Sequence, residues 1–232
     1  MATIIALDFA SKTETLNFLD LFRETPYRPF VKIGMELFYA EGPEIVREIK
    51  KRGHKIFLDL KLYDIPNTVR KAMRVLSALD VDIVNLHASG GSRMMREALE
   101  GLTRSDGSRP LLIAVTQLTS TSEEMLHDEL LVGTSMEQTI MAYAANAARC
   151  GLDGVVCSPW EAARVKEECG PGFLTVTPGI RFADSAADDQ VRIATPERAR
   201  ELGSDFIVVG RPITQAPDPV AAYVKCQKEF EK

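Results

Sequence analysis

The sequence lacks the features that mark several large classes of protein. It has only four cysteines, none of them in a C-x-x-C pair, so neither the usual spacing of a zinc site nor a disulfide framework is present. No apolar run approaches the ~18 residues that a membrane-spanning helix needs. The first residues contain no basic segment and no small-residue cleavage site, so we expect no secretory signal. These absences predict a cytoplasmic protein with reduced thiols.

Cofactor motifs and a basic surface are also missing. The chain has no Walker loop, no G-x-G-x-x-G, no H-E-x-x-H and no G-x-S-x-G. We therefore expect it to work without a metal ion or an organic cofactor. The formal net charge is −5, from 28 basic and 33 acidic residues. This balance argues against nucleic acid or an anionic membrane as the main partner, because both select basic surfaces. An anionic small molecule needs only local positive charge.

What the sequence does contain is an alternation of short β-rich runs and amphipathic segments. The predicted strands are Thr3–Phe9, Phe30–Met35, Lys55–Lys61, Ile83–His87, Leu111–Thr116, Gly154–Cys157, Leu174–Thr177 and Phe206–Val209. The predicted helices are Thr13–Phe22, Pro43–Lys51, Thr68–Leu79, Ser92–Thr103, Met136–Cys150, Trp160–Glu168, Pro196–Leu202 and Pro219–Phe230. Eight βα units predict an α/β fold, a single (β/α)8 TIM barrel, with a doubly wound open sheet as the alternative. No linker splits the chain, so we predict one domain over residues 1–232.

Charged side chains occur in predicted strands that should be apolar on both faces. Asp59 and Lys61 share one face of a strand, while leucines occupy the other face and must contact helices. Lys32 turns inward on the preceding strand by the same argument, and Asp64 follows Lys61 by three residues. The sequence therefore predicts a row of Lys32, Asp59 and Lys61 at the carboxyl end of the barrel, where active sites of this fold lie.

Two interpretations of this row are open. It is either a buried structural ion-pair network or part of an active site. Buried ion pairs are a poor way to gain stability, so the row favours function. Two ammonium groups beside a carboxylate also keep that carboxylate ionised.

A second group of residues has the character of a phosphate site. Arg211 follows Gly210 at the end of the last predicted strand, and the preceding connection, Arg181–Ala194, includes Gln190. The loops after strands seven and eight are the usual phosphate site of such barrels, and arginine offers a forked set of donors. The alternative is a surface arginine beside a turn glycine.

Residues 59–69, Asp-Leu-Lys-Leu-Tyr-Asp-Ile-Pro-Asn-Thr-Val, resemble the D-x-K-x-x-D-I-P-N-T signature of the orotidine 5′-monophosphate decarboxylase family. Three other segments, residues 30–34, 177–181 and 209–213, resemble that family's second-strand lysine, its T-P-G-I-R segment and its phosphate strand. The shorter D-x-K-x-x-D core is shared with related sugar-phosphate decarboxylases and synthases. The chain departs from the pattern at Tyr63, where histidine is frequent, and at Asp188, which replaces a common glycine.

The resemblance implies a homodimeric carboxy-lyase of de novo pyrimidine biosynthesis that converts orotidine 5′-monophosphate to uridine 5′-monophosphate. It implies that Lys61 delivers a proton to C6 and that Asp59 lies beside the substrate carboxylate. It places Asp8 and Lys32 on the ribose hydroxyls, and Asp64 and Thr68 in the site of the other subunit. It further places Thr119 and Pro178 at the pyrimidine, and Arg181, Gln190, Gly210 and Arg211 at the 5′-phosphate.

The decarboxylation that the resemblance implies needs a group of the kind that Lys61 provides. Loss of CO2 from C6 leaves a vinyl-type carbanion without a conventional electron sink, and a fixed ammonium group can stabilise and then protonate it. Two alternatives remain. One is a metal-dependent sugar-phosphate decarboxylase or aldolase on the same barrel, which would need Mg²⁺. The other is a catalytically silent nucleotide-binding protein, which would be marked by a lost lysine in the row.

Overall fold

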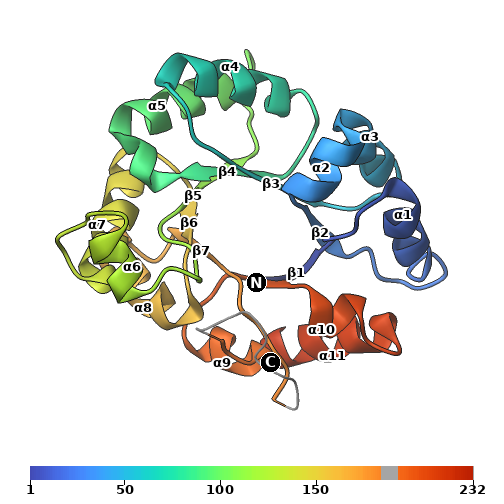
Figure 1. The fold of residues 1–232 in the computed structure, drawn as a ribbon. Helices are drawn as coiled ribbons and strands as arrows, with labels where there is room; N and C mark the ends of the chain where they lie inside the picture. The colour runs from blue at the N-terminus through green and yellow to red at the C-terminus, as the bar shows by residue number, and fades with distance from the viewer. Residues whose placement is uncertain (184–192, 232) are drawn as a thin grey trace.

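A computed structural model describes residues 1–183 and 193–231 of the chain, and every structural statement below concerns that part. Its strands form a closed, fully parallel barrel in chain order (Figure 1). They are β1 (Ala2–Ala6), β2 (Phe30–Ile33), β3 (Ile56–Leu62), β4 (Ile83–His87), β5 (Leu111–Val115), β6 (Gly154–Val156), β7 (Leu174–Thr177) and β8 (Phe206–Val209). Pairing of β1 with β8, from Ala2 opposite Phe206 onward, closes the barrel. The predicted TIM barrel is thus confirmed and the open sheet is excluded.

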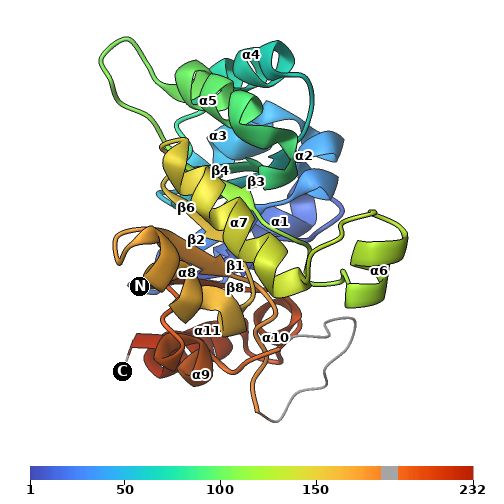
Figure 2. The same ribbon diagram turned by 90° about the vertical axis from the view of Figure 1, so that its left-hand side faces the viewer.

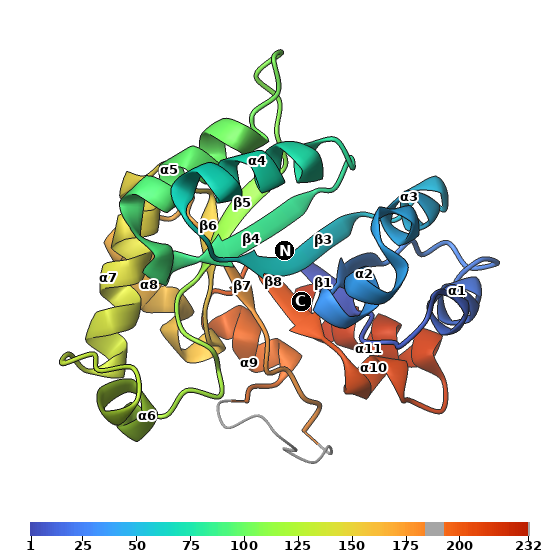
Figure 3. The ribbon, with the colours of Figure 1, turned by 45° about the horizontal axis from the view of Figure 1, so that its top comes forward.

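Helices surround the barrel on the outside (Figures 1 and 3). The described helices are α1 (Lys12–Asp20), α2 (Met35–Glu41), α3 (Pro43–Lys51), α4 (Pro66–Ser77), α5 (Gly91–Leu102), α6 (Glu123–Asp128), α7 (Met136–Arg149), α8 (Ala162–Cys169), α9 (Pro196–Glu201), α10 (Arg211–Thr214) and α11 (Pro219–Glu231). Short 3₁₀ turns, η1 (Ala88–Gly90) and η2 (Pro159–Glu161), follow β4 and β6. No helix in the described ranges is long and apolar enough to cross a bilayer.

Local sequence explains where these elements begin. Ser135 caps α7 by accepting a hydrogen bond from the Gln138 backbone, and Gln138 bonds back to the Ser135 backbone. Proline occupies the first turn of α3, α4 and α9, where its missing N–H leaves no helical bond unmade. Ser158 caps η2, so the chain after β6 starts with a 3₁₀ turn and α8 begins at Ala162 rather than at Trp160 as predicted.

Three short helices were not predicted: α2, α6 and α10. Each lies in a connection after a strand, and each is too short to show a clear apolar period in sequence. Of these, α6 lies in the connection between β5 and α7, and Figure 2 shows it beside one end of α7. These helices therefore lie at the carboxyl end of the barrel strands.

Two apolar clusters hold the barrel together. The larger one lies between strands and helices and includes Ile5, Leu7, Leu58 and Leu60. The smaller one fills the inside of the barrel: Ile4, Ala6, Phe30, Phe57, Ile83, Ile113, Val176 and Val208. Alternate residues of one strand thus face opposite clusters, as the period of two requires. Inward positions nearer the carboxyl ends of the strands are left for polar side chains.

Candidate active site

Four charged side chains meet at the carboxyl end of the barrel, three of them on β2 and β3 and one just after β1. This charged array consists of Asp8, Lys32, Asp59 and Lys61. The Nζ atom of Lys61 lies 2.7 Å from Oδ1 of Asp59, and the Nζ atom of Lys32 lies 3.4 Å from Oδ2 of Asp59. Lys32 also donates to Oδ1 of Asp8, at 3.0 Å. The row predicted from the strand period is therefore present, and Asp8 extends it, so that the charges alternate in sign.

Burial makes the pairing in this array strong. Asp59 is only 7% exposed. Burial alone raises the pKa of Asp59, but the ammonium groups of Lys32 and Lys61 outweigh it and hold that pKa below its ordinary value. Burial alone lowers the pKa of Lys32, but Asp59 and Asp8 outweigh it and raise that pKa. The Asp59 carboxylate and the Lys32 ammonium therefore both carry full charge at neutral pH.

Asn85 on β4 joins the array to the backbone, a role that the strand pattern alone does not reveal. Its side chain is buried, its Nδ2 donates to Oδ1 of Asp59 at 2.7 Å, and its Oδ1 accepts the Lys61 backbone N–H at 2.8 Å. That N–H is available because the β3–β4 register is irregular between Leu58 and Leu62. Lys61 has a φ of +49°, a left-handed conformation that costs a non-glycine residue about 1–3 kcal/mol. Asn85 therefore holds both the backbone of Lys61 and the carboxylate that its side chain contacts.

A cavity of about 300 Å³ opens beside the array. Lys32, Asp59 and Lys61 form one part of its wall. Thr119 and Pro178, which the resemblance places at the pyrimidine, form another part together with Gln117 and Ser120 of the β5–α6 connection. Its remaining wall is mostly apolar: Phe57, Val115, Leu118, Val156, Cys157 and Val208. A cavity of this size and lining suits a small organic molecule with a few polar groups.

Asp64 and Thr68 lie outside this cavity. Both are exposed at the start of α4, and Oδ1 of Asp64 accepts the backbone N–H of Ile65 at 2.6 Å. Within the described part of this chain, Asp64 pairs with none of the lysines of the charged array. The neighbouring Tyr63 is 60% exposed and its ring meets His87 edge-on, with centroids 6.0 Å apart.

The residues predicted for phosphate follow β7 and β8. Gly210 follows β8 and lies beside the array, since a Cβ atom built on it would lie 3.8 Å from Oδ2 of Asp8. Arg211 is the first residue of α10. Arg181 is buried after β7 and donates to the carbonyl oxygen of Ile180 at 2.9 Å. Gln190, like Asp188, lies outside the described residues.

Comparisons with known proteins agree on one family. A family model described as "Orotidine 5'-phosphate decarboxylase / HUMPS family" matches residues 1–226. The chain is 57% identical to the orotidine 5'-phosphate decarboxylase of Geobacillus sp. (strain WCH70), over 98% of this chain and 96% of that one. It is 59% identical to that of Bacillus caldolyticus, over 98% and 93%. The crystal structure of the Lactobacillus acidophilus orotidine 5'-phosphate decarboxylase superposes with a TM-score of 0.89 at 42% identity, over 100% of this chain and 99% of that chain.

The charged array predicts how stability depends on pH. The pKa of Asp59 lies below 3.8 in the folded chain, so its contribution is complete above pH 3.8 and is lost as pH falls through the lowered pKa. We expect wild type to exceed Asp59→Asn in free energy of unfolding, with a margin that shrinks below pH 3.8. Urea denaturation of both proteins across pH measures this margin, in which the titration of carboxylates remote from the array cancels. A margin that does not change with pH would contradict the pairing.

Proposed function

The chain belongs to the orotidine 5′-phosphate decarboxylase / HUMPS family, and on that premise we propose that its charged array carries out the decarboxylation of orotidine 5′-monophosphate to uridine 5′-monophosphate. The chain is a carboxy-lyase of pyrimidine biosynthesis. One observation carries the proposal for the site: the ammonium group of Lys61 lies against the buried carboxylate of Asp59 on the wall of a cavity.

Lys61 is the proton donor. When the bond between C6 and the carboxylate carbon breaks, CO2 leaves and the electron pair stays on C6. The Lys61 ammonium stabilises this pair as it develops and then transfers a proton to C6. Lys61 afterwards regains a proton from water. No electron acceptor outside the protein is needed for this balance.

Asp59 has two roles: it destabilises the bound substrate, and it holds the Lys61 ammonium group in place. Its carboxylate faces the substrate carboxylate, and their repulsion is relieved as the substrate group leaves as neutral CO2. Because its pKa is lowered by two lysines, Asp59 stays ionised and this repulsion persists at neutral pH. Asn85 is a positioning residue, which fixes the Lys61 backbone and the Asp59 carboxylate without lining the cavity.

The other substrate groups extend away from this centre. Asp8 and Lys32 take the ribose hydroxyls, and Thr119 and Pro178 contact the pyrimidine. The 5′-phosphate binds Arg181, Gln190, Gly210 and Arg211. The closeness of Gly210 to Asp8 supports this direction, since a Cβ atom at position 210 would lie 3.8 Å from Oδ2 of Asp8, so the phosphate end lies next to the ribose end. Binding energy from the distant phosphate is available to close the site and exclude water.

The active unit is a homodimer in the cytoplasm, in which Asp64 and Thr68 reach into the partner's site. Exposure supports this arrangement: Asp64 lies between Tyr63 and Ile65, which are 60% and 66% exposed. Large apolar side chains at that exposure fit a protein interface. The net charge of −5 supports a protein whose main partner is neither nucleic acid nor an anionic membrane.

The reaction is expected to need Lys61 and no divalent ion. Wild type should consume orotidine 5′-monophosphate, followed by its absorbance, at an unchanged rate in excess chelator. Lys61→Ala should lower kcat by at least about a hundredfold, because it removes a general acid. Lys228→Ala, which changes an exposed lysine on α11, is the control and should match wild type. Full dependence on a divalent ion would favour the metal-dependent sugar-phosphate alternative.

Asn85→Ala is expected to lower kcat by about ten- to a hundredfold through misplacement of Lys61. KM and inhibition by uridine 5′-monophosphate should stay near wild type, since Asn85 does not line the cavity. Ser77→Ala removes a similarly buried hydrogen bond, to the carbonyl oxygen of Leu102, and controls for general destabilisation. Equal kinetic losses in both variants would show that Asn85 is merely structural.

Arg211→Ala is expected to weaken substrate binding and to slow the chemical step together, because phosphate binding helps to close the site. Orotidine, which lacks the phosphate, should react at nearly the same rate with Arg211→Ala as with wild type. The comparison requires kcat/KM for both substrates on both proteins. If both substrates suffer equally, the assignment of Arg211 to phosphate is wrong.

The shared site predicts complementation between inactive variants. Lys61→Ala and Asp64→Ala should each be nearly inactive. In a mixed dimer, one site receives Lys61 from one chain and Asp64 from the other, and is intact. Random pairing makes about half of the dimers mixed, each with one good site of two, so about a quarter of wild-type activity should return after subunit exchange. Activity that stays at the level of the separate variants, with exchange proven, would place Asp64 in its own chain's site.

A further inference from the structure

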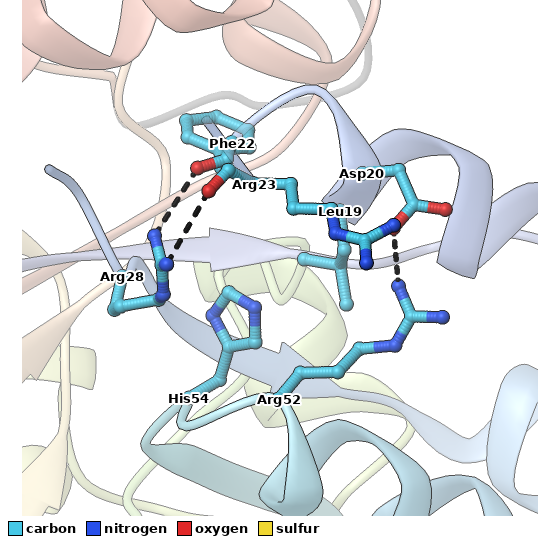
Figure 4. Close-up of a pocket in the computed structure, with 7 residues that line it drawn as sticks. All are labelled: Leu19, Asp20, Phe22, Arg23, Arg28, Arg52 and His54. Carbon is cyan, nitrogen blue, oxygen red and sulfur yellow. Dashed lines mark hydrogen bonds and ion pairs between the residues drawn. The ribbon is translucent and has the colours of Figure 1, made fainter. Parts of the chain in front are cut away.

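A second cavity lies at the opposite end of the barrel from the charged array. Its volume is about 380 Å³ and it is formed by the connections that lead into β2 and β3 (Figure 4). Because all strands are parallel, these connections enter at the amino ends of the strands. The residues that line it are Leu19, Asp20, Phe22, Arg23, Arg28, Arg52 and His54. This basic cavity takes no part in the reaction proposed above.

The lining is positive in a chain that is negative as a whole. Three arginines against one aspartate give +3 − 1 = +2 with His54 neutral, whereas the whole chain carries −5. The only carboxylate of the lining, Asp20, is bound to Arg52 at 2.7 Å. The exposed side chain of Arg23 makes no hydrogen bond or ion pair within residues 1–183 and 193–231. A guanidinium group is therefore available for a ligand at this cavity.

Arg28 gives the cavity a fixed shape. Its Nη1 donates to the carbonyl oxygens of Phe22 at 3.2 Å, Thr25 at 3.0 Å and Tyr27 at 2.8 Å. Its Nη2 donates to the carbonyl oxygen of Arg23 at 3.3 Å. These bonds tie together the connection between α1 and β2, so the wall of the basic cavity is formed before any ligand arrives. A preformed wall lowers the entropy cost of binding.

His54 gives the basic cavity a second polar group. The side chain is only 4% exposed, and its ring lies between Arg28 and Arg52 in Figure 4. Its Nδ1 is 2.9 Å from the carbonyl oxygen of Pro29. A carbonyl oxygen only accepts, so Nδ1 carries the proton, and the neutral ring offers Nε2 as a bare lone pair.

The surroundings of His54 keep the ring neutral. Burial lowers the pKa of His54, the Pro29 carbonyl raises it, and Arg28 and Arg52 lower it further, with a net shift downward. The other charged groups nearby are Arg23 and Asp20 of the lining, and Glu48, whose Oε1 lies 3.5 Å from Nε of Arg52. A negative ligand would oppose these effects and allow Nε2 to take up a proton and donate it in a hydrogen bond.

We propose that the basic cavity binds a phosphate monoester, with its phosphate between Arg23 and His54 and its organic part on the apolar floor. The negative phosphate suits a lining with an excess of arginine, and the guanidinium fork of Arg23 matches its oxygen atoms. Leu19 and Phe22, both nearly fully buried, provide the apolar floor that free phosphate does not need. Binding takes up a proton at His54, so affinity rises as pH falls toward the second pKa of the ester, about 6.

The test uses the ring signals of His54 in the NMR spectrum of wild type. The chain has three histidines, so the signals are assigned by eliminating those of His87 and His127 with single substitutions. Glycerol 3-phosphate is the probe, inorganic phosphate is the second arm, and sodium chloride controls for ionic strength. We expect glycerol 3-phosphate to shift the His54 signals saturably, to raise the pKa of the ring, and to bind more tightly than inorganic phosphate.

Arg23→Gln is the decisive variant. It should weaken binding about tenfold, the loss expected for one charge-assisted hydrogen bond, and leave decarboxylation unchanged. Arg74→Gln, at an exposed arginine on α4, is the matched control and should bind as wild type does. Unmoved His54 signals at tens of millimolar ester, or an equal response in Arg23→Gln, would overturn the site. Equal affinity for inorganic phosphate and the ester would overturn the assignment to a monoester.

Discussion

The sharing of one buried carboxylate by two ammonium groups is the interaction on which the rest of the site depends. Asp59 contacts Lys61 through one oxygen and Lys32 through the other, and Asn85 donates to the first. Without this carboxylate, two like charges would face each other in a confined space. With it, both lysines are held at fixed positions, and three neighbouring strands are connected at the end where the barrel has no apolar filling.

This arrangement is a poor choice for stability alone. Desolvating several charges is expensive, and apolar side chains of similar volume would stabilise the barrel at least as well. The barrel interior nearer the amino ends of the strands shows that solution, with an apolar cluster on the inward face of the same strands. The inward side chains of β3 change from apolar at Phe57 to charged at Asp59 and Lys61. This change therefore marks the boundary between residues that stabilise the barrel and residues that form the active site.

Much of this could be predicted from sequence because a period of two is enough to orient side chains on a strand. That period placed Asp59 and Lys61 on one face, and the alternation of strands and helices gave the barrel. Asn85 obeys the same period but was missed, because its importance depends on the β3–β4 register, which no single strand reveals. The left-handed backbone of Lys61 was equally invisible, since lysine does not favour it. The basic cavity combines residues from two separate connections, and only their folding together brings Arg23 near His54.

The backbone of Lys61 has a consequence for how this chain could be altered by selection or design. Glycine adopts a positive φ without a steric penalty, and asparagine adopts it more readily than lysine. The backbone conformation at position 61 would therefore favour glycine or asparagine, while the pairing with Asp59 and a screen for growth on endogenous pyrimidine synthesis would retain the lysine. Position 61 is thus a site where backbone conformation and function pull in opposite directions, as is common at strained catalytic positions.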